Sequence, residues 1–235
     1  MEPVLFYGVP HGCSFGSIVA LEWLGQPYRL CRIDMLSKPE GEAFSRISPL
    51  GETPALLLED GRALTESFAI MQNIGARNLE TRLGFAQGTP EFDRLNSVLA
   101  YLHTTFHSVF SPAWAAYKLA ESDPNREVLR ALARDKAARS YGHLQDMLDG
   151  REWLAGGETK SLADAYFIGI ARWGEDLGLF DLRKEYPRLY QHMQKLEADP
   201  GVIFAHAIED GNPGTSSGGF RGHVTLDELN PRLAA

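Results

Sequence analysis

The chain has 235 residues, of which 44% are hydrophobic and 23% are charged, the composition of an ordinary folded protein. It carries 31 acidic and 23 basic residues, a formal net charge of −8, and no lysine or arginine run offsets this charge, so we expect no nucleic-acid partner. No segment has the ~20 apolar residues that cross a bilayer, and the N-terminus lacks a secretion-signal pattern. We therefore expect a cytoplasmic protein without membrane association.

The first third of the chain predicts alternating strands and helices. The apolar run 4–7 ends in a glycine-containing turn, and helical spacing from 15 to 24 ends at Gly25 and Pro27. Further strands are predicted at 28–33, 55–58 and 63–65, and further helices at 40–47 and from 66–67 onward. The resulting order is βαβαββα.

The remainder predicts helices. A polar stretch at 78–90 is typical of a linker. Helices are expected at 91–119 with a kink at Pro112, at 127–148, at 162–173 behind a capping box of Ser161 and Asp164, and from 187 to about 199. The glycine-rich segment 211–219 predicts no regular structure.

Two cysteines, Cys13 and Cys31, are too few for a disulfide framework and too far apart for a redox pair. Cys13 and Ser14 lie just before a predicted helix, where free N–H groups and the helix dipole favour a thiolate. The alternatives are a structural cysteine and a serine that merely caps the helix. Cys31 lies inside a strand and is interpreted as a core residue.

Two further junctions could contact a ligand. Pro54 precedes a strand, and a cis Thr53–Pro54 bond would expose the Thr53 backbone, although most such bonds are trans. Glu66 and Ser67 stand where a strand meets a helix and could hold a zwitterionic group, or could simply cap the helix.

His103 and His107 lie one helical turn apart and could imitate a metal pair. No third histidine or carboxylate has a matching spacing. We therefore expect no metal.

Taken in chain order, four stretches resemble the cytosolic glutathione S-transferases, most closely their bacterial beta class. The similarity runs from about Val4 to Val202. The matching stretches are Gly12–Ser14 with Ile18–Leu21, Ser48–Gly61, Leu64–Met71, and Leu162–Phe167 with Arg172 and Trp173.

This resemblance implies a role for each candidate residue. It implies that Cys13, Ser14 and His103 are the catalytic residues. Cys13 and Ser14 would lie beside the glutathione sulfur, and His103 in the pocket for the second substrate. It also implies that glutathione contacts Lys38, Thr53, the cis-proline Pro54, Glu66, Ser67 and Asn96. Glutathione would be the co-substrate, with no separate cofactor.

The resemblance also implies an architecture and an activity. We expect a thioredoxin-like α/β domain at 1–80, a linker at 81–90, an all-α domain at 91–206 and a glycine-rich extension at 207–235. The implied activity is conjugation of glutathione to small hydrophobic electrophiles, as in detoxification, by a homodimer. Glutathione-dependent thiol–disulfide exchange through Cys13, and glutathione binding with little turnover, are the alternatives. Aromatic residues such as Phe106, Phe110 and Trp114 either shape the electrophile pocket or pack in the core.

Overall fold

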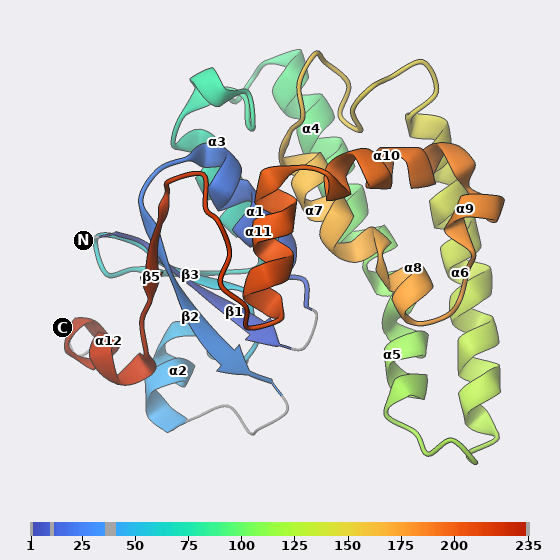
Figure 1. Ribbon diagram of the computed structural model, residues 1–235, viewed down its shortest axis with the longest axis horizontal. Coiled ribbons are helices and arrows are strands. Elements are labelled where there is room, and N and C mark those ends of the chain that lie inside the picture. Colours follow the sequence, from blue (N-terminus) through green and yellow to red (C-terminus); the bar gives the residue numbers. More distant parts are fainter. Residues whose placement is uncertain (1, 10–11, 36–40, 234–235) are drawn as a thin grey trace.

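A five-stranded sheet organises the N-terminal part of the chain (Figure 1). The computed structural model describes residues 2–9, 12–35 and 41–233. The strands are β1 (Val4–Val9), β2 (Tyr28–Asp34), β3 (Ala55–Leu57), β4 (Ala63–Thr65) and β5 (Phe220–His223), in the spatial order β4-β3-β1-β2-β5. β2 runs parallel to both β1 and β5, whereas β3 is antiparallel to both β1 and β4.

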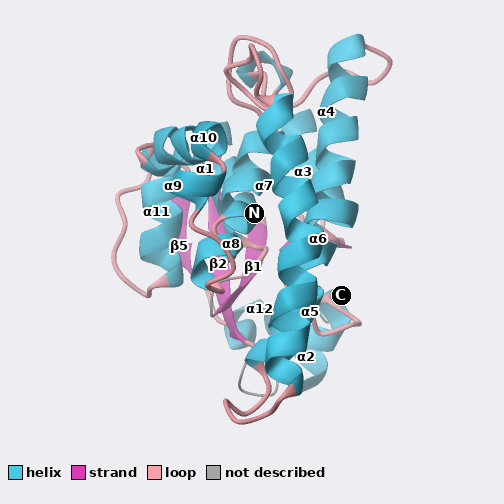
Figure 2. Cartoon of the chain, turned by 90° about the vertical axis from the view of Figure 1, so that its right-hand side faces the viewer, coloured by secondary structure: helices cyan, strands magenta, loops and turns pink. Residues whose placement is uncertain are grey.

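Helices cover both faces of this sheet (Figure 2). Alternate strand residues face opposite sides, so Leu5 and Leu30 join the apolar cluster that includes α1 (Phe15–Leu24) and α3 (Ser67–Ala76). Val4 and Ile33 instead join the cluster on α2 (Gly41–Ile47) and α12 (Leu226–Leu233). The predicted βαβαββα order is therefore confirmed.

Helices and short turns form the rest of the chain. They are η1 (Leu79–Thr81), α4 (Pro90–Ala100), η2 (Tyr101–Phe106), η3 (Ser108–Phe110), α5 (Ser111–Tyr117), α6 (Asn125–Met147), α7 (Leu162–Ala171), α8 (Trp173–Asp176), α9 (Leu182–Glu185), α10 (Pro187–Glu197) and α11 (Pro200–Glu209). The predicted capping box is present: Asp164 accepts hydrogen bonds from the backbone and hydroxyl of Ser161. Among the described residues, no helix is both long and apolar enough to cross a membrane.

The long helix predicted at 91–119 is interrupted. A π-helical turn, η2, and a 3₁₀ turn, η3, separate α4 from α5, and Pro112 lies in the first turn of α5, where its missing N–H costs no hydrogen bond. π-Helical turns are frequent at functional sites. Here the turn carries His103.

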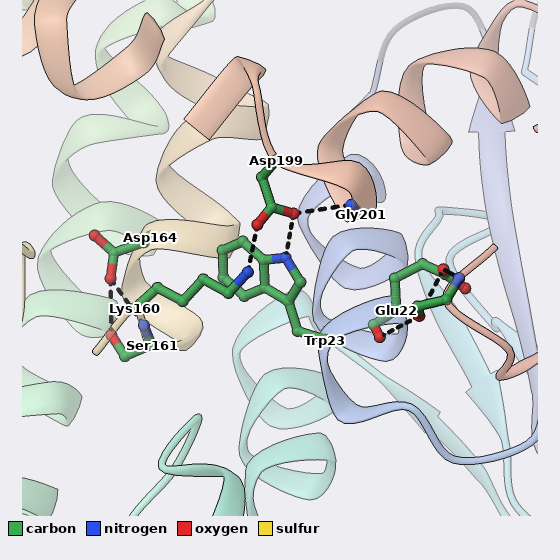
Figure 3. A network of polar contacts seen from close by, with 8 residues as sticks. Glu22, Trp23, Lys160, Ser161, Asp164, Asp199 and Gly201 are labelled. Atoms are coloured by element: carbon green, nitrogen blue, oxygen red, sulfur yellow. Dashed lines mark hydrogen bonds and ion pairs between the residues drawn. The ribbon is translucent and has the colours of Figure 1, made fainter. Parts of the chain in front are cut away.

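A helix that the sequence analysis did not predict, α11, begins directly after α10. Asp199 accepts a hydrogen bond from the Gly201 N–H at its start, and Trp23 of α1 donates its indole N–H to the same carboxylate at 2.7 Å (Figure 3). Lys160 forms an ion pair with Asp199 as well. These contacts hold α11 against α1.

The C-terminal extension, in which the sequence analysis predicted no strand, adds an edge strand to the sheet. Phe220–His223 pairs with β2 as the edge strand β5, and α12 packs beneath the sheet through Leu229. The strand was missed because Phe220–His223 contains a single large apolar residue and follows a glycine-rich segment. Its pairing depends on distant contacts rather than on its own propensity.

Candidate active site

A cavity of about 770 Å³ lies between the sheet region and the helical region. Four chain segments meet in it: the start of α1, the loop before β3, the start of α3 and the turn η2. Its lining consists of Cys13, Ser48, Pro49, Leu50, Glu52, Thr53, Pro54, Thr65, Glu66, Ser67, Phe68, Ala69, Ala100, His103, Thr104, His107 and Tyr166. Six of the nine expected site residues therefore share one cavity.

The polar end of the cavity is built from two backbone junctions. The Thr53–Pro54 peptide bond is cis, as the resemblance implied. Glu66 has a φ of 68°, which is unusual for a residue with a side chain, and its ψ of 119° lets the chain turn from β4 into α3. Ser67 is thereby placed at the start of α3, where free N–H groups attract an anion.

The thiol of Cys13 is half-buried and donates a hydrogen bond to the carbonyl oxygen of Thr53, with Sγ and O separated by 3.4 Å. Burial raises the pKa of Cys13 to about 11, and the carboxylates of Glu52 and Glu66 act in the same direction. A hydrogen bond with Ser67 lowers the pKa only in part. Desolvation therefore opposes the effect of the helix terminus and favours the thiol over the thiolate.

Three expected residues are not part of this lining. Ser14 is 1% exposed, and its hydroxyl accepts the Gly8 N–H at 3.0 Å, which ties the start of α1 to β1. Asn96 accepts a hydrogen bond from Gln72, joining α4 to α3. Lys38 lies outside the described residues. The sequence pattern points to Ser14 and Asn96 as site residues. It does not reveal that the side chain of Ser14 hydrogen-bonds with Gly8 and that of Asn96 with Gln72.

His103 is held in the cavity wall by three contacts. Its Nδ1 lies 2.7 Å from the Leu99 carbonyl oxygen, its ring stacks on Tyr166 with centroids 3.6 Å apart, and Phe68 meets it edge-on. Burial lowers the pKa of His103 to about 4, so the ring is neutral at pH 7. Because Nδ1–H donates to the carbonyl, Nε2 keeps its lone pair, and Nε2 is buried with no hydrogen-bond partner among the described residues.

The sequence analysis missed Tyr166 as a site residue. It belongs to an almost continuously apolar stretch of α7, which predicted a core helix. Its hydroxyl hydrogen-bonds with Ser67, and burial raises the pKa of Tyr166 well above its usual value, so it stays protonated. The only sequence signal was a hydroxyl within an otherwise apolar run.

The two histidines of the possible metal pair, His103 and His107, both line the cavity. Burial also lowers the pKa of His107. Among the described residues, no group of three or more His, Cys, Asp or Glu side chains could hold a metal ion.

Phe106 and Phe110 pack in the core rather than in the cavity wall. Both are fully buried and contact Tyr141 of α6. Trp114 packs edge-on against Trp173. The apolar cavity wall consists instead of Leu50, Phe68, Ala69 and Ala100, among other residues.

Comparison with known proteins identifies the family. Residues 13–77 match the profile "Glutathione S-transferase, N-terminal domain", and residues 101–200 match "Glutathione S-transferase, C-terminal domain". Glutathione S-transferase GstA of Escherichia coli O157:H7 is 28% identical over 175 residues, which are 72% of this chain and 81% of the relative.

Solved structures agree with these matches. A sphingomonad glutathione S-transferase complexed with glutathione is 30% identical, with a TM-score of 0.77 over 88% of this chain and 98% of the relative. The beta-class enzyme of Sphingomonas chungbukensis is 27% identical, with a TM-score of 0.76 over 88% and 98% of the two chains. The chain therefore belongs to the cytosolic glutathione S-transferase family and is most like its bacterial beta class.

Proposed function

We propose that the protein conjugates glutathione to small hydrophobic electrophiles. The observation that carries this proposal is the meeting of Cys13, the cis Thr53–Pro54 bond and the Glu66–Ser67 junction in one cavity. Glu66 supplies a carboxylate for the ammonium of the γ-glutamyl end, and the start of α3 with Ser67 supplies donors for its carboxylate. The Thr53 backbone pairs with the cysteinyl unit.

In this arrangement the glutathione sulfur lies near Cys13 and the first turn of α1. When glutathione binds, the Cys13 thiol, protonated at pH 7, turns its single S–H from the Thr53 carbonyl oxygen to the glutathione thiolate and so favours the ionised form. The helix N–H groups add to this preference. The glutathione proton leaves to solvent, the thiolate forms a bond to the electrophilic carbon, and the leaving group departs with its electron pair.

The same raised pKa disfavours the alternative of thiol–disulfide exchange by Cys13. Exchange requires a thiolate, and a thiol with a pKa of about 11 is almost wholly protonated at pH 7. Conjugation uses the thiolate of the substrate instead. Cys13 therefore serves as a hydrogen-bond donor rather than as the nucleophile.

His103 lies on the electrophile side of the cavity. Because Nε2 is buried and the ring is neutral at pH 7, His103 contributes an uncharged part of the wall to a hydrophobic electrophile. On the family resemblance we further infer that Lys38 and Asn96 contribute to glutathione binding, that the protein is a cytoplasmic homodimer, and that it acts in detoxification.

The test compares two reactions and two cysteine variants. The wild-type protein should conjugate glutathione to chlorodinitrobenzene and reduce hydroxyethyl disulfide poorly. Cys13→Ala should lose conjugation by about 10- to 100-fold, the range for one hydrogen bond to a charged atom, whereas Cys31→Ala, altered in the core, should keep it. Glutathione binding by calorimetry without turnover on any of a panel of electrophiles would show a binding protein instead.

A further inference from the structure

A second cavity, of about 1060 Å³, lies at the edge of the sheet formed by β2 and β5, between the end of α11 and the C-terminal segment that leads into α12. It is lined by Tyr7, Arg32, Ile208, Gly211, Asn212, Pro213, Gly214, Phe220, His223, Val224, Thr225, Leu226 and Asp227. Of these residues, only Arg32 falls within the ranges that match the family profiles. The cavity is therefore built mainly by a part of the chain outside the family match.

The C-terminal segment that roofs this cavity is held in place by Glu22 of α1. Glu22 is 2% exposed, and its carboxylate accepts hydrogen bonds from the Ser217 N–H and hydroxyl, the Ser216 hydroxyl and the Tyr28 hydroxyl. A buried carboxylate saturated in this way anchors the segment firmly. The hydrogen bonds of Glu22 therefore fix the position of the segment that roofs the cavity.

Apolar packing sets the shape of the floor and roof. Phe220 of β5 packs against both Tyr28 and Phe204. Gly214 passes so close to Phe204 that an added Cβ would lie 2.8 Å from its ring. In Figure 1 the same segment runs beside α11 before it enters β5. The cavity wall contains the apolar residues Ile208, Pro213, Phe220, Val224 and Leu226, and apolar walls of this kind are usual for small-molecule sites.

One end of the cavity is polar and carries a positive charge. The Tyr7 hydroxyl and His223 Nε2 lie 3.1 Å apart, and the charge of Arg32 acts to lower the pKa of both groups. The guanidinium is seated under the turn after α11, since an added Cβ on Gly211 would lie 3.0 Å from its Nη1. Arg32 is the one cationic side chain among the described residues of this lining.

The two groups closest to the polar end of the cavity carry no charge at pH 7. Burial raises the pKa of Tyr7, which stays protonated, and burial together with the charge of Arg32 lowers the pKa of His223, which stays neutral at pH 7. Asp227 of the lining is exposed, as Arg32 is, and the nearby Glu209 forms an ion pair with Arg172. A guanidinium beside apolar walls is suited to a carboxylate on an apolar body, because its planar donors match the two carboxylate oxygens.

We propose that this cavity binds a small hydrophobic monocarboxylate, with the carboxylate on Arg32 and the apolar body against Phe220, Val224 and Leu226. The site is separate from the glutathione cavity, with which it shares no lining residue. It can therefore be occupied while glutathione is bound. The proposal does not depend on the proposed transferase activity.

The test uses three fluorescent probes that share one apolar body: pyrenebutyrate, pyrenebutanol and pyrenebutylamine. Binding to the full-length protein is measured in the presence of saturating S-hexylglutathione, which occupies the glutathione and electrophile sites. Pyrenebutyrate should bind about tenfold more tightly than the alcohol, the effect of one charge-assisted hydrogen-bond pair. The amine should bind no more tightly than the alcohol.

The variants then identify the residue responsible. Arg32→Gln should abolish the preference for the carboxylate while circular dichroism stays that of the wild-type protein. Arg221→Gln removes an equally exposed arginine of β5 that does not line the cavity, and should keep the preference. Equal binding of the three probes, a preference for the amine, competition by S-hexylglutathione or an unchanged preference in Arg32→Gln would each overturn the proposal.

Discussion

The Cys13 thiol shows that position along the chain does not by itself determine the pKa of a residue. Its place before α1 predicts a lowered pKa, yet its partial enclosure by the cavity wall and two nearby carboxylates raise the pKa to about 11. The thiol donates to the Thr53 carbonyl in consequence. A protonated donor at this point stabilises a substrate thiolate without competing as a nucleophile.

The raised pKa predicts slow alkylation of Cys13. Only the thiolate reacts with iodoacetamide, and a pKa of about 11 leaves about one molecule in 10⁴ ionised at pH 7. In a Cys31→Ala background, the adduct rate measured by mass spectrometry should therefore rise about tenfold for each pH unit between 6 and 9. A rate that reaches its plateau below pH 8 would show that the thiol is ionised near neutrality.

At the scale of elements, the cavity depends on close contact between α1 and α7. Gly16 of α1 lies so near α7 that an added Cβ would be 2.7 Å from the Ala165 carbonyl oxygen and 2.8 Å from the Tyr166 Cα. Gly169 of α7 approaches the Gly16 nitrogen in return. Because Cys13 precedes α1 and Tyr166 lies on α7, this contact determines the width of the cavity.

Gly16→Ala should therefore destabilise the protein. The added methyl group would clash with backbone atoms of α7, which cannot shift without disturbing the helix. Overpacking of this kind lowers the free energy of unfolding by about 1–3 kcal/mol. Gly142→Ala is the matched control: it lies in α6, meets nothing within 4 Å, and should gain up to about 1 kcal/mol in helix propensity. Urea unfolding measures both changes, and equal stabilities of the two variants would contradict the close contact.

At the scale of the whole molecule, one apolar cluster joins the sheet region to the helical region. It includes Leu5 and Leu30 of the sheet, Phe15 of α1, and Phe167 and Tyr141 of the helices. Neither region buries this surface without the other. We therefore expect the two regions to unfold together, although glutathione S-transferases contain two family domains along the sequence.

Cooperative unfolding can be tested with two single-tryptophan variants. One keeps Trp23 of α1, and the other keeps Trp153, which lies among the helices after α6. In each variant, the unfolding midpoint measured by tryptophan fluorescence should equal the midpoint measured by far-UV circular dichroism. A fluorescence midpoint separated from the circular-dichroism midpoint in either variant would show that the regions unfold independently.

The sequence by itself determined the order of the first seven elements and the junctions that carry Cys13, Thr53 and Glu66. Hydrophobic period, turn residues and caps act over a few neighbouring residues, so they can be recognised locally. Only the tertiary structure decided that residues 220–223 extend the sheet, that Tyr166 lines the cavity and that the Ser14 hydroxyl accepts a hydrogen bond from the Gly8 N–H. These outcomes depend on burial and on partners far along the chain, which determine the local dielectric, the hydrogen bonds and hence the chemistry of each group.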